Sequence, residues 1–238
     1  MPNDYFQFKQ FIVNQDKCGM KVCTDSCVFG AWMAAKIKYR FPKTILDIGT
    51  GTGLLSLMVA QKNGGLIHAI DINNDAVSQA KENFDLSPWS KQLQACGGDI
   101  KTWPATSKYD CIISNPPFFE DDFLPIEEGK KNSKHSNSLR LAELVAAVTD
   151  LLAADGFFGV LLPYERAEYF EKEAIKYLLF VNEQLRIRQS IEHDYFRTIL
   201  ILEKKQNPII KSEISIRNNN NEYTPEFIAL LKDYYLYL

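Results

Sequence analysis

A short segment, Ser114-Asn115-Pro116-Pro117-Phe118, combines a side-chain amide, two prolines and an aromatic ring directly after the apolar run 109–113. The length of this run and the prolines that end it predict a buried parallel strand that stops here. Each proline favours an extended conformation in the residue before it, so the backbone is stiff. The segment therefore presents the acceptor and donor of the Asn115 amide beside a ring on which a flat molecule can stack.

This arrangement suits chemistry at the exocyclic amine of adenine. The lone pair of that nitrogen is delocalised into the ring, which makes the amine a poor nucleophile. Two acceptors on its N–H bonds, the Asn115 side-chain carbonyl and the Pro116 backbone carbonyl, would favour a pyramidal nitrogen, and stacking on Phe118 would direct its lone pair at an electrophile. An isolated segment of this kind is more often a proline-rich turn with an asparagine cap, so its context decides.

A glycine-rich segment, residues 46–53, lies where a first strand is predicted to become a helix. Glycines allow a sharp turn and a close approach of the backbone to a ligand. Gly49, Gly51 and Gly53 are spaced G-x-G-x-G, which differs from the G-x-G-x-x-G of dinucleotide folds, and Asp47 precedes them. We expect a ligand-binding turn, with a purely structural turn as the alternative.

Two further acids follow predicted strands. Asp71, with Ile72 after it, comes directly after the predicted strand 66–70. A carboxylate in this place can accept hydrogen bonds from both ribose hydroxyls of a nucleoside cofactor. Asp99, followed by Ile100, comes just beyond the third predicted strand. Its carboxylate could accept a hydrogen bond from the adenine amine of that cofactor, and a helix cap is the alternative.

Strands and helices alternate from Thr44 onwards, which predicts an α/β protein with a mostly parallel sheet. The last two predicted strands are separated by a short junction near residues 193–195, so we expect them to form an antiparallel hairpin at one edge. The result is a seven-stranded variation on the doubly wound, Rossmann-like fold. The predicted strands are 44–47, 66–70, 92–95, 109–114, 156–162, 183–189 and 197–203. The predicted helices are 53–62, 74–84, 139–152 and 164–178.

Three regions are expected within one globular unit. Residues 1–43 form an N-terminal arm, with a strand or extended stretch over 5–13 and a helix that starts at Thr24-Asp25. Residues 44–206 form the main body. Residues 207–238 form a C-terminal extension, in which Asn218 to Asn221 are expected to be a polar turn or disordered, and Thr224-Pro225 starts a terminal helix.

The composition, 46% hydrophobic and 24% charged, is that of an ordinary globular protein. The sequence has no run of 18 apolar residues and no secretory signal at residue 1, so we expect no membrane partner and a cytoplasmic location. The odd number of cysteines, with no nearby histidine and no C-x2-C spacing, favours reduced buried thiols over a metal site. These are Cys18, Cys23, Cys27, Cys96 and Cys111.

Charge is distributed unevenly about a net value of −3, which argues against indiscriminate nucleic-acid binding and allows a local basic patch. Residues 1–43 carry 7 basic and 3 acidic side chains, residues 129–140 carry 4 and none, and residues 44–128 carry 5 and 12. A basic arm and a basic loop would therefore flank an acidic body. Candidate phosphate contacts, each of which could instead be an ordinary solvated side chain, are Lys9, Lys17, Lys21, Lys130, Lys131, Lys134 and Arg140.

The glycine-rich segment and the asparagine segment follow the first and fourth predicted strands. The strand order of a doubly wound sheet reverses between these two strands, and ligands bind in the crevice at their carboxyl ends. The two segments are therefore expected to meet across one cleft, with a nucleoside cofactor on one side and the target amine on the other.

These combined motifs resemble the class I S-adenosylmethionine-dependent amino-methyltransferases, and nearly the whole chain resembles the bacterial tRNA1(Val) adenine-37 N6-methyltransferase family. Family members commonly have tyrosine where this chain has Phe118, which keeps the stacking surface and loses a phenol hydrogen bond. The wider resemblance is carried by Phe8-Lys9-Gln10-Phe11, Met20-Lys21-Val22, Thr24-Asp25, Gly30-Ala31-Trp32, Ser87-Pro88-Trp89 and Tyr234-Tyr235-Leu236.

The resemblance implies a seven-stranded methyltransferase sheet, S-adenosylmethionine as cofactor, no metal, and N6-methylation of adenosine 37 in the anticodon stem-loop of tRNA1(Val), by an enzyme expected to be a monomer. Catalytic roles fall on Asn115, Pro116, Pro117 and Phe118. Cofactor contacts fall on Lys21, Thr24, Asp25, Asp47, Gly49, Gly51, Gly53, Asp71, Ile72, Asp99, Ile100 and Asn115. For the segment from Lys21 to Asp25, a helix cap is the alternative.

Three other functions stay open on the sequence. The asparagine segment also serves methylation of a glutamine side-chain amide in translation release factors. A ribosomal RNA adenine is a second possible target. A non-catalytic RNA-binding protein with a nucleoside pocket is the third, and the intact Asn115-Pro116-Pro117 segment argues against it.

Overall fold

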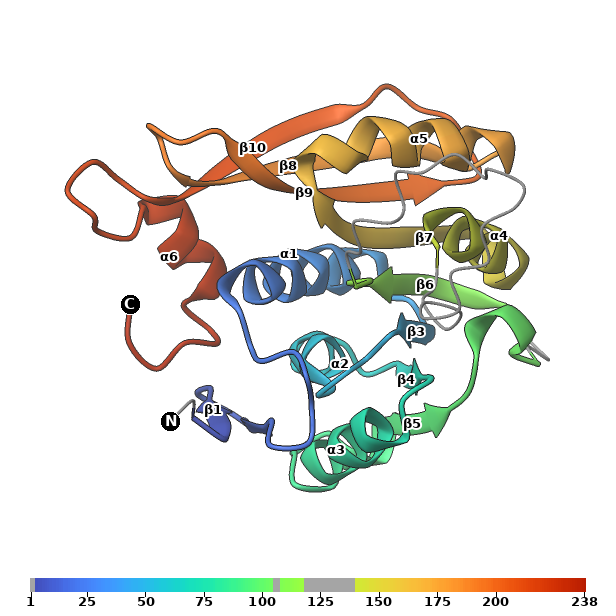
Figure 1. Ribbon diagram of the computed structural model, residues 1–238, viewed down its shortest axis with the longest axis horizontal. Helices are drawn as coiled ribbons and strands as arrows, with labels where there is room; N and C mark the ends of the chain where they lie inside the picture. Colours follow the sequence, from blue (N-terminus) through green and yellow to red (C-terminus); the bar gives the residue numbers. More distant parts are fainter. Residues whose placement is uncertain (1–2, 105–107, 118–139) are drawn as a thin grey trace, which may run out of the picture.

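The computed structural model describes residues 3–104, 108–117 and 140–238, and these are organised around an eight-stranded sheet (Figure 1). Neighbouring strands are parallel, except that β9 is antiparallel to both β7 and β8. The order across the sheet is β10 (Ile210–Arg217), β8 (Phe180–Ser190), β9 (Tyr195–Glu203), β7 (Leu152–Pro163), β6 (Tyr109–Ser114), β3 (Thr44–Ile48), β4 (Leu66–Asp71) and β5 (Leu93–Gly97). The predicted α/β, doubly wound class is confirmed.

The strand order reverses at β3, which lies between β4 and β6. Asp47 on β3 is opposite Ala69 on one side and Ile113 on the other. Both faces of the sheet are covered here, which explains why the central strands are almost continuously apolar. The loops that leave the carboxyl ends of β3 and β6 therefore lie side by side, as the two motifs predicted.

The predicted number of strands was wrong. Residues 210–217, for which no strand was predicted, form β10, which pairs in parallel with β8 and makes the eighth strand. The β8–β9 hairpin therefore does not lie at the edge of the sheet, because β10 takes that place. Ile214 and Ile216 alternate with polar residues and are buried, so they attach the strand to the core. The asparagine run only forms the turn that follows, where Asn221 has a positive φ of 61°.

Helices cover both faces of the sheet (Figure 1). One face carries α1 (Thr24–Arg40), α2 (Leu54–Ala60), α3 (Asn74–Asp85) and α6 (Pro225–Leu231), and the other carries α4 (Leu141–Leu151) and α5 (Ala167–Lys176). Helix α1 approaches α2 closely at Gly30, where an added Cβ would lie 2.5 Å from the Met58 sulfur. Helix α6 starts as predicted, because Thr224 Oγ1 accepts a hydrogen bond from the Phe227 N–H.

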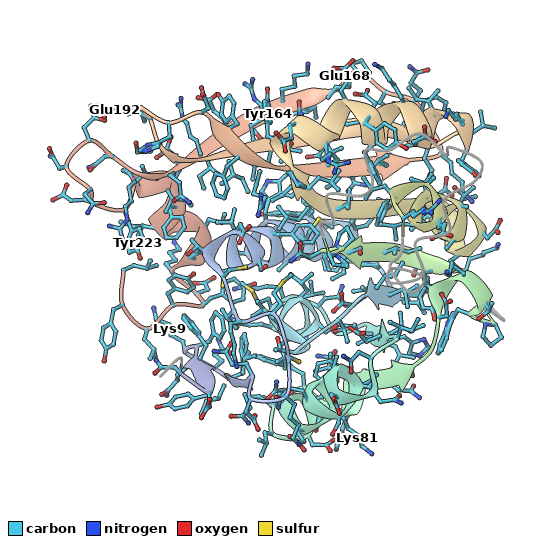
Figure 2. All side chains as sticks on the ribbon, viewed as in Figure 1. Lys9, Lys81, Tyr164, Glu168, Glu192 and Tyr223 are labelled. Carbon is cyan, nitrogen blue, oxygen red and sulfur yellow. The ribbon has the colours of Figure 1, made fainter. Side chains whose placement is uncertain are left out.

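The N-terminal arm packs against the C-terminal segment. Strands β1 (Tyr5–Gln7) and β2 (Ile12–Asn14) form a small antiparallel hairpin, and Phe8 after β1 forms a β-bridge with Tyr235. The Lys9 ammonium, visible beside the C-terminal segment in Figure 2, donates to the Lys232 carbonyl at 2.6 Å. No helix in the described parts of the chain is long and apolar enough to cross a membrane.

Candidate active site

A cavity of about 620 Å3 opens at the carboxyl ends of β3, β4 and β6. This volume is typical of sites for small organic ligands. Many of the predicted site residues meet in its wall, although they come from segments far apart in the sequence. They are Lys21, Gly49, Gly51, Asp71, Ile72, Asp99, Ile100, Asn115, Pro116 and Pro117.

The glycine loop forms an open cradle in this wall. Gly49, Gly51 and Gly53 all have positive φ angles, of 72°, 55° and 81°. A Cβ on Gly49 or Gly51 would meet no protein atom within 4 Å, whereas a Cβ on Gly53 would lie 2.5 Å from the Phe84 ring. The first two glycines therefore leave room for a ligand, and the third allows α2 to pack against α3.

Asp47 lies beneath this loop and outside the cavity wall. Its Oδ2 accepts hydrogen bonds from Thr50 Oγ1 at 2.8 Å and from Ser56 Oγ at 2.7 Å. Its Oδ1 has no partner among the described residues. Complete burial raises the pKa of the Asp47 carboxyl to about 6, with a smaller contribution from Asp71, and the two hydroxyl hydrogen bonds oppose the rise. Asp47 thus fixes the loop to α2, which shapes the cradle from below.

Asp71 and Asp99 are both oriented by backbone N–H groups. Asp71 accepts from the N–H groups of Gly51 and Asn73, each at 2.9 Å, and each of its oxygens keeps acceptor capacity for a ligand hydroxyl. Asp99 accepts from the Lys101 N–H at 3.0 Å and caps the 3-10 helix η2 (Ile100–Thr102). The helix-cap alternative is therefore realised for Asp99, while the residue still lines the cavity.

Asn115 brings a hydrogen-bond acceptor without a partner to the cavity wall. Its Nδ2 donates to Ser26 Oγ at 3.0 Å, whereas its buried Oδ1 has no partner in the described part of the chain. Leaving a buried carbonyl unpaired costs about 1–3 kcal/mol, and a ligand N–H would remove that cost. Phe118, the predicted stacking ring, lies outside the described residues.

The N-terminal segment 17–22 lies along the cavity, and buried polar side chains of α3 hold both its start and the end of β2 that precedes it. Gln79 Oε1 accepts from the Lys17 N–H at 2.9 Å. Asn83 accepts from the Asn14 N–H and donates to the carbonyls of Asn14 and Thr52. The sequence analysis did not predict these two residues. A signal was present, because Gln79 and Asn83 are four positions apart on the same helix face as the apolar residues Ala76, Ala80 and Phe84. Two amides on a buried face indicate hydrogen bonds to another segment.

Thr24 and Asp25 are placed at the start of α1, outside the cavity wall. Asp25 Oδ2 accepts from Arg197 Nε at 2.8 Å, and Oδ1 accepts from the Ser26 N–H at 3.1 Å. The bond from Arg197 attaches the N-terminus of α1 to the start of β9. Lys21, by contrast, lines the cavity, and its ammonium donates to the Gln15 carbonyl.

The candidate RNA contacts are only partly described. Lys130, Lys131 and Lys134 lie outside the described residues. Lys17 pairs with Glu82, and the exposed Arg140 precedes α4, where its N–H donates to Glu143 Oε2 at 3.0 Å. Among the residues that the structure describes, no group of three or more histidines, cysteines, aspartates and glutamates is placed to hold a metal ion.

Three comparisons with known proteins agree with this geometry. The methyltransferase small domain model matches residues 24–128. Curated relatives from Trichodesmium erythraeum and Phocaeicola vulgatus, each named tRNA1(Val) (adenine(37)-N6)-methyltransferase, are both 37% identical and covered over 99% of each chain. The structure of a predicted O-methyltransferase from Agrobacterium tumefaciens is similar with a TM-score of 0.65 at 12% identity, covering 88% of this chain and 96% of the other.

The reversed strand order, the glycine cradle and the neighbouring acids define a class I methyltransferase. The full-length similarity to the curated relatives is more specific than the fold. The chain belongs to the tRNA1(Val) (adenine(37)-N6)-methyltransferase family.

Proposed function

We propose that this protein transfers a methyl group from S-adenosylmethionine to N6 of adenosine 37 in the anticodon loop of tRNA1(Val). The observation that carries the proposal is that Asn115, a residue of the cavity wall opposite the glycine cradle, has an Oδ1 with no partner among the described residues. An acceptor in this position matches the N–H group of an adenine amine. The names of the relatives support tRNA1(Val) as the RNA.

The cofactor would be held by residues that the structure brings together. Asp71 would accept hydrogen bonds from the ribose hydroxyls, and Asp99 would accept one from the adenine amine. Gly49 and Gly51 leave space for the methionine part of the cofactor. When bound, S-adenosylmethionine supplies a methyl group on a positively charged sulfur, which becomes a neutral thioether once the methyl is transferred.

The target amine would be held by Asn115 and Pro116. The Asn115 side-chain carbonyl and the Pro116 backbone carbonyl would accept hydrogen bonds from the two N–H groups of the amine. This favours a pyramidal nitrogen with its lone pair directed away from the two carbonyls. The methylated aminium is acidic, so its proton passes to water or to these acceptors without a strong general base. An anticodon-loop base is unpaired, so moving it into a pocket costs little.

The decisive experiment is incubation of the protein with radiolabelled S-adenosylmethionine and total tRNA, total ribosomal RNA or a release factor, followed by nucleoside and peptide analysis. We expect label in N6-methyladenosine from tRNA. Label in ribosomal RNA or in a release-factor glutamine would overturn the tRNA assignment, and binding of NAD without any S-adenosyl ligand would overturn the cofactor assignment. We further propose that the enzyme acts in the cytoplasm. We also propose that it is a monomer, and sedimentation would test this oligomeric state.

A further inference from the structure

The hydrogen bond that holds the Asn115 amide comes from a distant element. Ser26 lies in the first turn of α1, is 5% exposed, and accepts from Asn115 Nδ2 through its Oγ at 3.0 Å. Asn115 itself follows β6, 89 positions further along the chain. The contact therefore sets the position of one wall of the cavity relative to the other.

A serine hydroxyl can bond either end of an amide. It has one hydrogen and two lone pairs, so it can accept from the NH2 group or donate to the carbonyl. Cys23 Sγ lies 2.9 Å from Ser26 Oγ. If the Ser26 hydrogen is donated to this sulfur, the lone pairs of Oγ face Asn115, and only the orientation with NH2 towards Ser26 forms a hydrogen bond.

We propose that Ser26 is a positioning residue that fixes the orientation of the Asn115 amide, with Cys23 Sγ as the acceptor of its hydroxyl hydrogen. The inference rests on the proposed function, because it concerns the acceptor for the adenine amine. With NH2 held by Ser26, Oδ1 lies on the other side of the amide and has no partner in the part of the chain that the structure describes. With the amide reversed, an NH2 group would meet the N–H of the substrate, and two donors would oppose each other.

The test compares Ser26→Ala with the unchanged enzyme in tRNA methylation and in calorimetric binding of S-adenosylhomocysteine. One neutral hydrogen bond gives an expected fall in kcat of about fivefold, with cofactor affinity and the KM for tRNA changed less than about twofold. Ser87→Ala is the matched control, because it removes another buried serine hydroxyl, one that donates to the Phe84 carbonyl. We expect its kcat to equal that of the unchanged enzyme.

A double-mutant cycle separates positioning from a general structural effect. In an Asn115→Ala background, Ser26→Ala should cause no further loss of kcat, because the amide that it orients is absent. An equal loss in both backgrounds, or no loss in either, would overturn the inference. If Ser26→Ala folds poorly, Ser26→Cys is the second variant, because it keeps a side chain of similar shape with a weaker acceptor. We expect its kcat to lie below that of the unchanged enzyme. Absence of N6-methyladenosine with the unchanged enzyme would instead refute the proposed function.

Discussion

At the scale of single residues, the candidate site depends on a hydrogen-bond acceptor that the described part of the protein does not pair. The Nδ2 group of Asn115 and both oxygens of Asp71 each have a protein hydrogen bond, while Asn115 Oδ1 has no partner among the described residues. A folded protein rarely buries such a group without use for it. Asp47 also has a buried oxygen with no partner among the described residues, but it lies beneath the loop and outside the cavity wall. A ligand in the cavity would therefore be next to Asn115 and not next to Asp47.

The Asn115 acceptor should act mainly in the transition state. We expect Asn115→Ala to lower kcat for tRNA methylation by about 10²-fold or more, with the affinity for S-adenosylhomocysteine little changed. Steady-state kinetics and calorimetry check the two quantities separately. Equal losses in both would mean that the substitution disturbs the cavity as a whole and would contradict a specific role for the amide.

Asp47 should make stability depend on pH in an unusual direction. Its pKa is raised by burial to about 6 in the folded protein, so the folded state binds the proton more tightly than the unfolded state. The stabilisation is therefore present below pH 4 and is lost as pH rises to about 6, by up to about 3 kcal/mol. Chemical denaturation across this window should show that difference between the unchanged protein and Asp47→Asn, which cannot titrate. Parallel pH profiles of the two proteins would contradict it.

At the scale of elements, the loop between β3 and α2 divides its glycines between binding and packing. An alanine with positive φ costs roughly 1–2 kcal/mol at either Gly49 or Gly53. Only Gly53 adds an overlap, with the Phe84 ring at 2.5 Å. The loop thus offers a matched pair of substitutions.

We expect Gly53→Ala to lower the free energy of unfolding more than Gly49→Ala, because of that overlap. We expect Gly49→Ala to weaken S-adenosylhomocysteine binding by more than its effect on stability explains, because its methyl group enters open cavity space. Thermal unfolding and calorimetry measure the two effects. Equal stability losses together with unchanged cofactor affinity in Gly49→Ala would remove the loop from the cofactor site.

The sequence predicted those elements whose signals are local. The seven strands of the main body follow from short apolar runs between helical patterns, and the switch point follows from their parallel order. It did not predict β10, because the four asparagines that follow it outweighed the alternation at Ile214 and Ile216. It also missed Ser26, Gln79 and Asn83, because their partners are up to 89 positions away. Such contacts exist only after the fold has formed.

At the scale of the whole molecule, the choice of RNA must come from surfaces outside the cleft, because an exposed adenine offers the same amine in any RNA. Residues 1–43 and 129–140 are both net-basic. Within the first, Lys9 and Lys17 already have protein partners, the Lys232 carbonyl and Glu82. The second is therefore the better candidate for contacts to the tRNA backbone, on the grounds of charge alone.

Replacing Lys130, Lys131 and Lys134 together by alanine should weaken tRNA binding and reduce the salt dependence of the binding constant by up to about three phosphate contacts. Filter binding at several salt concentrations measures this slope. The paired replacement of Lys172 and Lys176, exposed lysines on α5 with Glu168 and Glu173 as partners, is the control. An unchanged slope in the triple variant would move the RNA site elsewhere on the molecule.

The packing of the N-terminal arm on the C-terminal segment has a consequence for synthesis of the protein. The segment 17–22 lines the cavity, yet the arm that leads into it is bonded to residues far later in the sequence, through Phe8 with Tyr235 and the Lys9 N–H with the Tyr234 carbonyl. A nascent chain whose residue 235 is still inside the ribosome has already released the described residues of the cavity wall, but it cannot fasten the arm. The ability to bind the cofactor should therefore arise only once residue 235 has left the ribosome and can meet the arm.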